Sequence, residues 1–175
     1  MRGSFQFMVM AFLGCSGGSN TDTGEPGDAR CGSTETPAVA LGQGVGGAFA
    51  NFDPGAQVGL DIAPQGGFGV TAQVQTVGLQ EGPARVTVRT EIDGAASGSF
   101  TFEDAELQPT LQIFCRDDGT GTLGSGVAVG FDPEVYTQDN LTKLDGVEAD
   151  LIVDVEDGSG ETASGRATVT ILVGG

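Results

Sequence analysis

The sequence predicts an all-β domain built from two antiparallel sheets packed face to face. Three observations predict it: apolar and polar residues alternate along several segments, turn dipeptides separate those segments, and glycine is abundant, at 31 of 175 residues. Alternation places successive side chains on opposite faces of a strand. A glycine-rich chain with few aromatic residues favours short strands and tight turns over long helices.

Four long segments show the alternation most clearly. Each presents one apolar face and one mostly polar face, as a sheet covered on one side requires. These segments span residues 70–76, 85–92, 146–156 and 163–173. Asp-Gly dipeptides at 93–94, 118–119 and 157–158 predict turns between strands. Because the last dipeptide separates two long segments, 146–156 and 163–173 form the clearest predicted hairpin.

Shorter strands complete the expected domain, which covers residues 38–175. They are expected near residues 38–42, 46–52, 57–62, 99–103, 110–115 and 125–131. Residues 132–142 are expected to form one helical turn or a loop, and no longer amphipathic helix is predicted. About seven to nine short strands favour an immunoglobulin-like β-sandwich, with a β-barrel as the alternative.

The charge of the chain restricts its partners. There are 24 acidic and 7 basic residues, and the formal net charge is -17. Such a surface repels phosphate backbones, so nucleic-acid binding is not expected. It also opposes docking on anionic lipid through basic residues, so attachment to a membrane needs another device. The acidity either keeps the protein soluble or collects Ca²⁺ or a cationic partner.

The amino-terminal residues follow the order of an export signal. Arg2 precedes an apolar run over residues 5–13, which is far shorter than the ~20 residues that span a bilayer. Gly14 and Cys15 come directly after that run. This order resembles the lipobox of bacterial lipoproteins, in which the signal is cut before a cysteine that carries diacylglycerol. The resemblance implies a signal peptide over residues 1–14, cleavage between Gly14 and Cys15, and lipidation of Cys15.

The resemblance also implies a location and leaves two cysteines to explain. In that family a residue other than Asp after the cysteine, here Ser16, implies sorting to the outer membrane. Residues 15–37 are rich in Gly, Ser, Thr and Pro, which predicts a flexible linker. With Cys15 assigned to lipid, Cys31 and Cys115 remain, and an oxidising compartment predicts a disulfide between them. Two free thiols are the alternative. An ordinary secretory signal, with Cys15 incidental, is the alternative to the lipobox.

A second resemblance concerns residues 40–92. The segment 42–52, the sequence Ala-Pro-Gln-Gly-Gly-Phe at 63–68 and the sequence Val-Thr-Val-Arg at 86–89 resemble uncharacterised lipoproteins of myxobacterial type. That resemblance implies a sandwich domain of unassigned function. The Pro-Gln-Gly-Gly segment is equally well explained as a simple turn, because glycine adopts positive φ at no steric cost.

Motifs for cofactor or metal binding are incomplete. Residues 42–47 satisfy GxGxxG, with Asp61 beyond them, but the dinucleotide fingerprint needs a following helix and this sequence predicts strand and turn. We therefore assign no cofactor. Carboxylates at 103–106, 116–118 and 154–157 offer oxygen ligands for Ca²⁺, yet none of them forms a complete calcium loop. We assign no metal site, and a weak calcium-dependent binder remains an alternative.

The residues for catalysis are also missing from the sequence. The chain has no histidine, which is the commonest general base. We therefore expect no enzyme. The first hypothesis is a lipid-anchored, non-catalytic interaction module of the cell envelope, with a protein or glycan as its partner. The alternative is a passive structural or assembly accessory of the envelope.

Overall fold

The computed structural model describes residues 29–32, 36–44, 48–62, 67–102, 111–124 and 126–174. Within these ranges the chain forms a twelve-stranded mixed sheet and a single 3-10 turn, η1 (Leu141–Leu144). The strands are β1 (Ala38–Gln43), β2 (Ala50–Asn51), β3 (Ala56–Gly59), β4 (Asp61–Ile62), β5 (Phe68–Val77), β6 (Gly82–Ile92), β7 (Ala95–Phe102), β8 (Leu111–Cys115), β9 (Gly121–Leu123), β10 (Val127–Gly130), β11 (Glu148–Asp157) and β12 (Thr162–Leu172).

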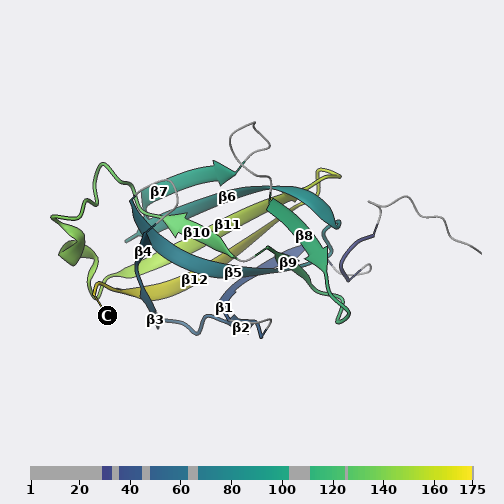
Figure 1. Cartoon of the computed structure of the whole chain (residues 1–175), viewed down its shortest axis with the longest axis horizontal. Helices are drawn as coiled ribbons and strands as arrows, with labels where there is room; N and C mark the ends of the chain where they lie inside the picture. Colours follow the sequence, from purple (N-terminus) through teal and green to yellow (C-terminus); the bar gives the residue numbers. More distant parts are fainter. Residues whose placement is uncertain are drawn as a thin grey trace, which may run out of the picture.

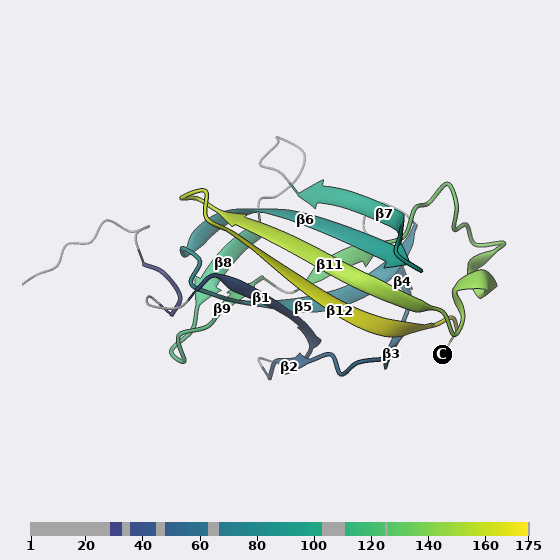
Figure 2. The same ribbon diagram turned by 180° about the vertical axis from the view of Figure 1, so that it is seen from behind.

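The strands lie in two layers (Figures 1 and 2). One layer contains β7, β6, β11, β12 and β3, and the other contains β5 with β1, β4, β9 and β10. Strand β8 pairs with both β6 and β9, so it joins the layers at one end. The strand order runs from β2 to β3 and is not closed into a barrel. The predicted all-β sandwich is confirmed.

The long strands agree closely with the alternating segments. The hairpin predicted for 146–156 and 163–173 is formed by β11 and β12. The structure pairs Glu148 with Thr170 at one end and Glu156 with Thr162 at the other. Strands β6 and β7 meet at a two-residue turn in which Asp93 has φ 52° and Gly94 has φ 75°. Positive φ at both positions is the type I′ geometry that suits the twist of a hairpin.

Smaller elements differ from the prediction. Strand β9 was not predicted, and the strand expected over 46–52 is β2, two residues long; residues 45–47 lie outside the described ranges. Residues 132–140 form a loop of turns, as one of the two alternatives for 132–142 predicted, and the 3-10 turn η1 begins only at Leu141. Of the Pro-Gln-Gly-Gly segment at 64–67, only Gly67 is described.

The core lies between the two layers. It contains the inward side chains of the long strands, and in the register Val88 faces Val153 and Val86 faces Val155. All four of these side chains are buried. Full burial of a Val or Leu side chain stabilises the folded state by about 1.5 to 3 kcal/mol. The apolar alternation therefore fixes which face of each strand points inward.

Candidate functional site

The sandwich has two unlike ends, which we name by their contents. The disulfide end consists of residues 29–32 and the turns 78–81, 116–120 and 157–161. The loop end consists of the turn 93–94, strand β4, the loop 131–147 and the end of β12. Figure 1 shows the two ends at opposite extremes of the long axis, with the carboxyl terminus at the loop end.

Residues 29–32 form a docked segment at the disulfide end. The Cys31 N–H donates to the Leu79 carbonyl at 3.0 Å, and the Glu81 N–H donates to the Ala29 carbonyl at 2.8 Å. The Gly78 N–H donates to the Cys31 carbonyl at 2.5 Å. The segment thus pairs with the turn between β5 and β6. Four residues of the predicted linker, 15–37, therefore lie against the domain.

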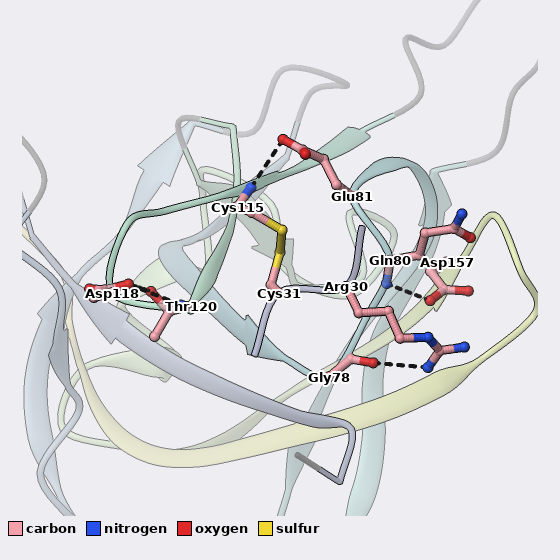
Figure 3. Close-up of a disulfide and its surroundings, with 9 residues drawn as sticks. All are labelled: Arg30, Cys31, Gly78, Gln80, Glu81, Cys115, Asp118, Thr120 and Asp157. Atoms are coloured by element: carbon pink, nitrogen blue, oxygen red, sulfur yellow. Dashed lines mark hydrogen bonds between the residues drawn. A yellow bond between two sulfur atoms is a disulfide. The ribbon is translucent and has the colours of Figure 1, made fainter. Parts of the chain in front are cut away.

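A disulfide joins the docked segment to β8 (Figure 3). The Cys31 and Cys115 sulfurs are 2.02 Å apart, and the two Cα atoms are 5.1 Å apart. This confirms the predicted pairing. Cys31 is 2% exposed and belongs to the hydrophobic core. A Cβ placed on Gly121 would lie 2.9 Å from the Cys31 sulfur, so this glycine leaves room for the disulfide.

Arg30 extends the contact between the docked segment and the domain. Its guanidinium donates to the Gly78 carbonyl at 3.1 Å and to Ser159 Oγ at 3.3 Å. It also lies 3.5 Å from the Glu161 carboxylate. Arg30 therefore connects the docked segment to two turns that are distant in sequence, 78–81 and 157–161.

The buried Asp157 carboxylate joins two turns of the disulfide end through hydrogen bonds. Oδ2 accepts from the Gln80 N–H at 2.7 Å. Oδ1 accepts from the Ser159 N–H, Ser159 Oγ and the Glu161 N–H at 2.8, 2.6 and 3.0 Å. Burial raises the pKa of Asp157, but the hydrogen bonds from Ser159, Gln80 and Glu161 outweigh burial and hold this pKa below its ordinary value. The carboxylate is 4% exposed and stays ionised.

The acidic segment 154–157 is not a calcium loop. Asp154 pairs with Arg89 at 2.8 Å and Glu156 pairs with Arg85 at 3.8 Å on the outer face of the sheet. Asp157 is buried and bonded as described above, so its carboxylate is not available to the same ion. Sequence analysis had not identified Asp157 as a structural centre, because Asp-Gly signals only a turn.

The acidic segment 116–118 is described, and its Asp118 carboxylate is occupied by hydrogen bonds. The Asp118 carboxylate accepts from the Thr120 N–H at 2.9 Å and from Thr120 Oγ1 at 2.6 Å, and these two bonds lower the pKa of Asp118. Residues 103–106 lie outside the described ranges. Among the described residues, no three Asp, Glu, Cys or His side chains gather closely enough to hold a metal ion.

In the described part of the GxGxxG segment 42–47, Gly42 allows a close hairpin. A Cβ on Gly42 would lie 2.1 Å from the Ala50 carbonyl oxygen, because β2 returns directly beside β1. A strand and not a helix therefore follows this motif. Residues 45–47 lie outside the described ranges, and Asp61 is in the exposed strand β4.

The outer face of β6, β11 and β12 is covered by paired charges. Arg166 donates to both Glu91 and Asp150, and Arg89 donates to Asp154. Ile152 lies in register between Arg89 and Arg166 and is only 5% exposed, outside the main core. The aliphatic stems of long basic side chains cover apolar surface in this way. A hollow of about 170 Å³ on this face is lined by Arg85, Thr87, Asp154, Val155, Glu156 and Thr162.

The loop end carries acidic residues and exposed apolar groups. The loop 131–147 has four acidic residues and one lysine. Among the described residues, four large apolar side chains are exposed, and three of these are on loop-end elements: Ile62 at 79%, Val135 at 53% and Leu172 at 38%. The fourth, Phe114 at 49%, is on β8.

Backbone contacts fix both ends of this loop to the sandwich. The Phe131 N–H donates to the Phe68 carbonyl at 2.8 Å, and the Gly146 N–H donates to the Ile171 carbonyl at 2.8 Å. Asn140 closes the loop on itself: its Nδ2 donates to the Val135 carbonyl and its Oδ1 accepts from the Thr137 N–H, both at 2.8 Å. The loop end therefore presents Val135 on a defined scaffold.

The predicted lipidation and cleavage residues, Cys15 and Gly14, lie outside the described ranges. In the described part of the chain, no helix has the length and apolar character needed to cross a membrane. No family model matches the chain. No curated protein matches it at a significant level either.

Proposed function

We propose that this protein is a lipid-anchored component of the cell envelope, held at the outer membrane by diacylglycerol on Cys15. Its sandwich would act as a non-catalytic interaction module for a protein or glycan. The anchor is supported by the order of Arg2, the apolar run at 5–13, Gly14 and Cys15. The net charge of -17 supports the anchor indirectly. A chain this acidic is not expected to bind anionic lipid through basic residues, so attachment to a membrane would need a covalent lipid.

The observation that carries the interaction module is the contrast between the two ends. The docked segment brings the chain into the domain at the disulfide end, through Cys31 and Arg30. An anchor on Cys15 would therefore hold that end toward the membrane. The loop end, which lies opposite the disulfide end in Figure 2, would then face away from the membrane. Its exposed side chains Ile62, Val135 and Leu172 would be available to a partner.

The chemistry of the loop end suits a partner with basic and apolar groups. Asp132, Glu134, Asp139 and Asp145 surround Val135 in the sequence of the loop, with Lys143 as the single basic residue there. A rim of charge around a few apolar side chains is the usual composition of a transient protein interface. The outer sheet face suits a partner less well, because its arginines are already paired with carboxylates.

The anchor is tested by mass spectrometry of the mature amino terminus. The wild-type chain is expected to begin at Cys15 with a diacylglyceryl adduct and to fractionate with membranes. The Cys15→Ala variant is expected to lose the adduct and to be released. An unmodified Cys15 in a chain that is still membrane-bound would contradict the proposal.

The interaction module is tested by crosslinking in intact envelopes. A partner that is crosslinked to the wild-type chain is expected to be lost in the double variant Ile62→Ser, Val135→Ser. The control is Phe114→Ser, which removes an apolar side chain at β8 about as exposed as Val135 and is expected to retain the partner. If the double variant keeps the crosslinks, the loop end is not the binding surface. If no crosslink forms with the wild-type chain, the domain is a passive accessory of the envelope.

A further inference from the structure

Four Asp-Gly dipeptides lie in described turns of this protein, at 93–94, 118–119, 145–146 and 157–158. Such a dipeptide can undergo a defined reaction, because glycine has no Cβ to shield its backbone nitrogen. That nitrogen attacks the side-chain Cγ of the aspartate, an N–Cγ bond forms, and water leaves to give a cyclic succinimide. Water then opens either carbonyl. Opening at the main-chain carbonyl leaves isoaspartate, in which the backbone runs through Cβ and Cγ.

Three of the four carboxylates are held away from this reaction. Asp157 accepts four hydrogen bonds and is buried. Asp118 accepts from the backbone and the hydroxyl of Thr120. Asp145 Oδ1 accepts from the Val173 N–H at 2.9 Å. Each of these carboxylates has to break its hydrogen bonds before its Cγ can turn toward the following glycine nitrogen.

Asp93 is different in three respects. It is exposed at the tip of the hairpin between β6 and β7. Its carboxylate has no hydrogen bond or ion pair with any residue in the described ranges. It is also the single non-glycine residue of those ranges with positive φ, at 52°. A Cβ makes positive φ unfavourable, so opening of the turn at Asp93 costs less free energy.

We propose that Asp93 is a site of spontaneous isomerisation to isoaspartate in the folded protein, through a succinimide with Gly94. The product adds one atom to the backbone of a two-residue turn whose type depends on its length. The change occurs at the loop end, where β6 passes into β7. This proposal does not depend on the proposed anchor or on the proposed interaction module.

Protonation reinforces the difference among the four sites. The neutral acid reacts faster than the carboxylate, because hydroxide is a better leaving group than oxide. The hydrogen bonds from Thr120 lower the pKa of Asp118, and those from Ser159, Gln80 and Glu161 lower the pKa of Asp157 against the effect of burial. Both residues are therefore neutral for a smaller fraction of the time.

The test uses the folded full-length chain in water enriched in oxygen-18. Each passage through the succinimide adds one heavy oxygen to the aspartate concerned. After reduction and tryptic cleavage at Arg89, Arg116 and Arg166, peptide fragmentation assigns the heavy oxygen and the isoaspartate to single residues. We expect Asp93 to isomerise about tenfold faster than Asp145, Asp118 or Asp157, since one hydrogen bond to a charged group lowers the reactive population by about that factor.

Two controls make the result decisive. In urea, where the turns are lost, the four dipeptides are expected to react at similar rates. The Asp93→Gly variant keeps a Gly-Gly sequence that suits a type I′ turn, and it is expected to show no reaction at that position. Equal rates at the four sites of the folded chain, or a faster reaction at Asp118, Asp145 or Asp157, would overturn the proposal.

Discussion

The disulfide end and the loop end both hold an irregular segment against the sandwich, but they do so with different chemistry. At the disulfide end a covalent bond and the Arg30 guanidinium fix the docked segment, and the buried Asp157 carboxylate joins the two turns that Arg30 contacts. At the loop end, backbone bonds at Phe131 and Gly146 and the amide of Asn140 fix the loop 131–147. The first kind of attachment would suit the proposed anchor on Cys15, because it joins the docked segment covalently to the domain. The second kind would suit the proposed partner surface.

The largest expected effect comes from removing the disulfide. The double variant Cys31→Ser, Cys115→Ser opens a link between residues 84 positions apart. We expect the free energy of unfolding to fall by about 4 to 5 kcal/mol, because the unfolded chain gains the entropy of an open loop. Urea unfolding measures this change, and reduced wild-type protein should give the same value.

Hydrogen exchange on the same variant tests whether the disulfide stabilises the disulfide end more than the loop end. The amides of Cys31, Gly78 and Glu81 are expected to lose protection, since their partners belong to the docked segment or its turn. The amides of Phe131 and Gly146 should change much less. Equal loss at the two ends would show that the disulfide acts on the whole sandwich and not on one end.

The next effect comes from Asp157. The Asp157→Asn variant keeps the shape of the side chain but removes its charge and one acceptor oxygen. We expect a loss of about 2 to 3 kcal/mol, because the N–H groups of Gln80, Ser159 and Glu161 lose a charged acceptor. The matched control is Asp118→Asn at the exposed turn of β8 and β9, for which we expect a much smaller shift of the unfolding midpoint. An equal shift in both variants would contradict the structural role of Asp157.

The contribution of Asp157 should also depend on pH. Its hydrogen bonds hold the pKa of the folded state below the ordinary value of 3.8, in spite of burial. The stabilisation is therefore fully present above that value and is lost as the pH falls through the lower pKa of the folded state. The difference in unfolding free energy between wild type and Asp157→Asn should be constant near neutral pH and should shrink in acid. A difference that grows in acid would mean that the pKa is raised.

The long strands could be predicted because their signal is local. Alternation along 148–157 and 162–172 is visible within each strand, and Asp157-Gly158 marks the turn between them. Strand β9 has three residues, Gly-Thr-Leu, which are too few to show a period. Ile152 shows the limit of alternation, since it is apolar on the polar face and is covered by two arginines from neighbouring strands.

The docked segment could be predicted only in part. The pairing of Cys31 with Cys115 followed from the number of cysteines and the expected compartment. The composition of 15–37 predicted a linker, because a stretch rich in Gly, Ser and Pro has little to bury. The contacts of residues 29–32 are with the turns 78–81 and 157–161, and such distant pairing leaves no periodic signal in the segment itself. The role of Asp157 was hidden for the same reason, since its partner Gln80 is 77 residues away.

The smallest expected effect is at the loop end, with Asn140→Ala. The side chain makes two hydrogen bonds, both within the loop, to the Val135 carbonyl and the Thr137 N–H. We expect a loss of about 1 kcal/mol or less, because water replaces the amide at an exposed site. Hydrogen exchange should rise at Thr137 and stay unchanged at Cys31 and Glu81. Asp139→Ala, which removes a side chain next to Asn140, should leave exchange at Thr137 as it is. If Asn140→Ala instead loosened the disulfide end, the two ends would be coupled through the sheet, and the loop could not adapt to a partner without disturbing the docked segment.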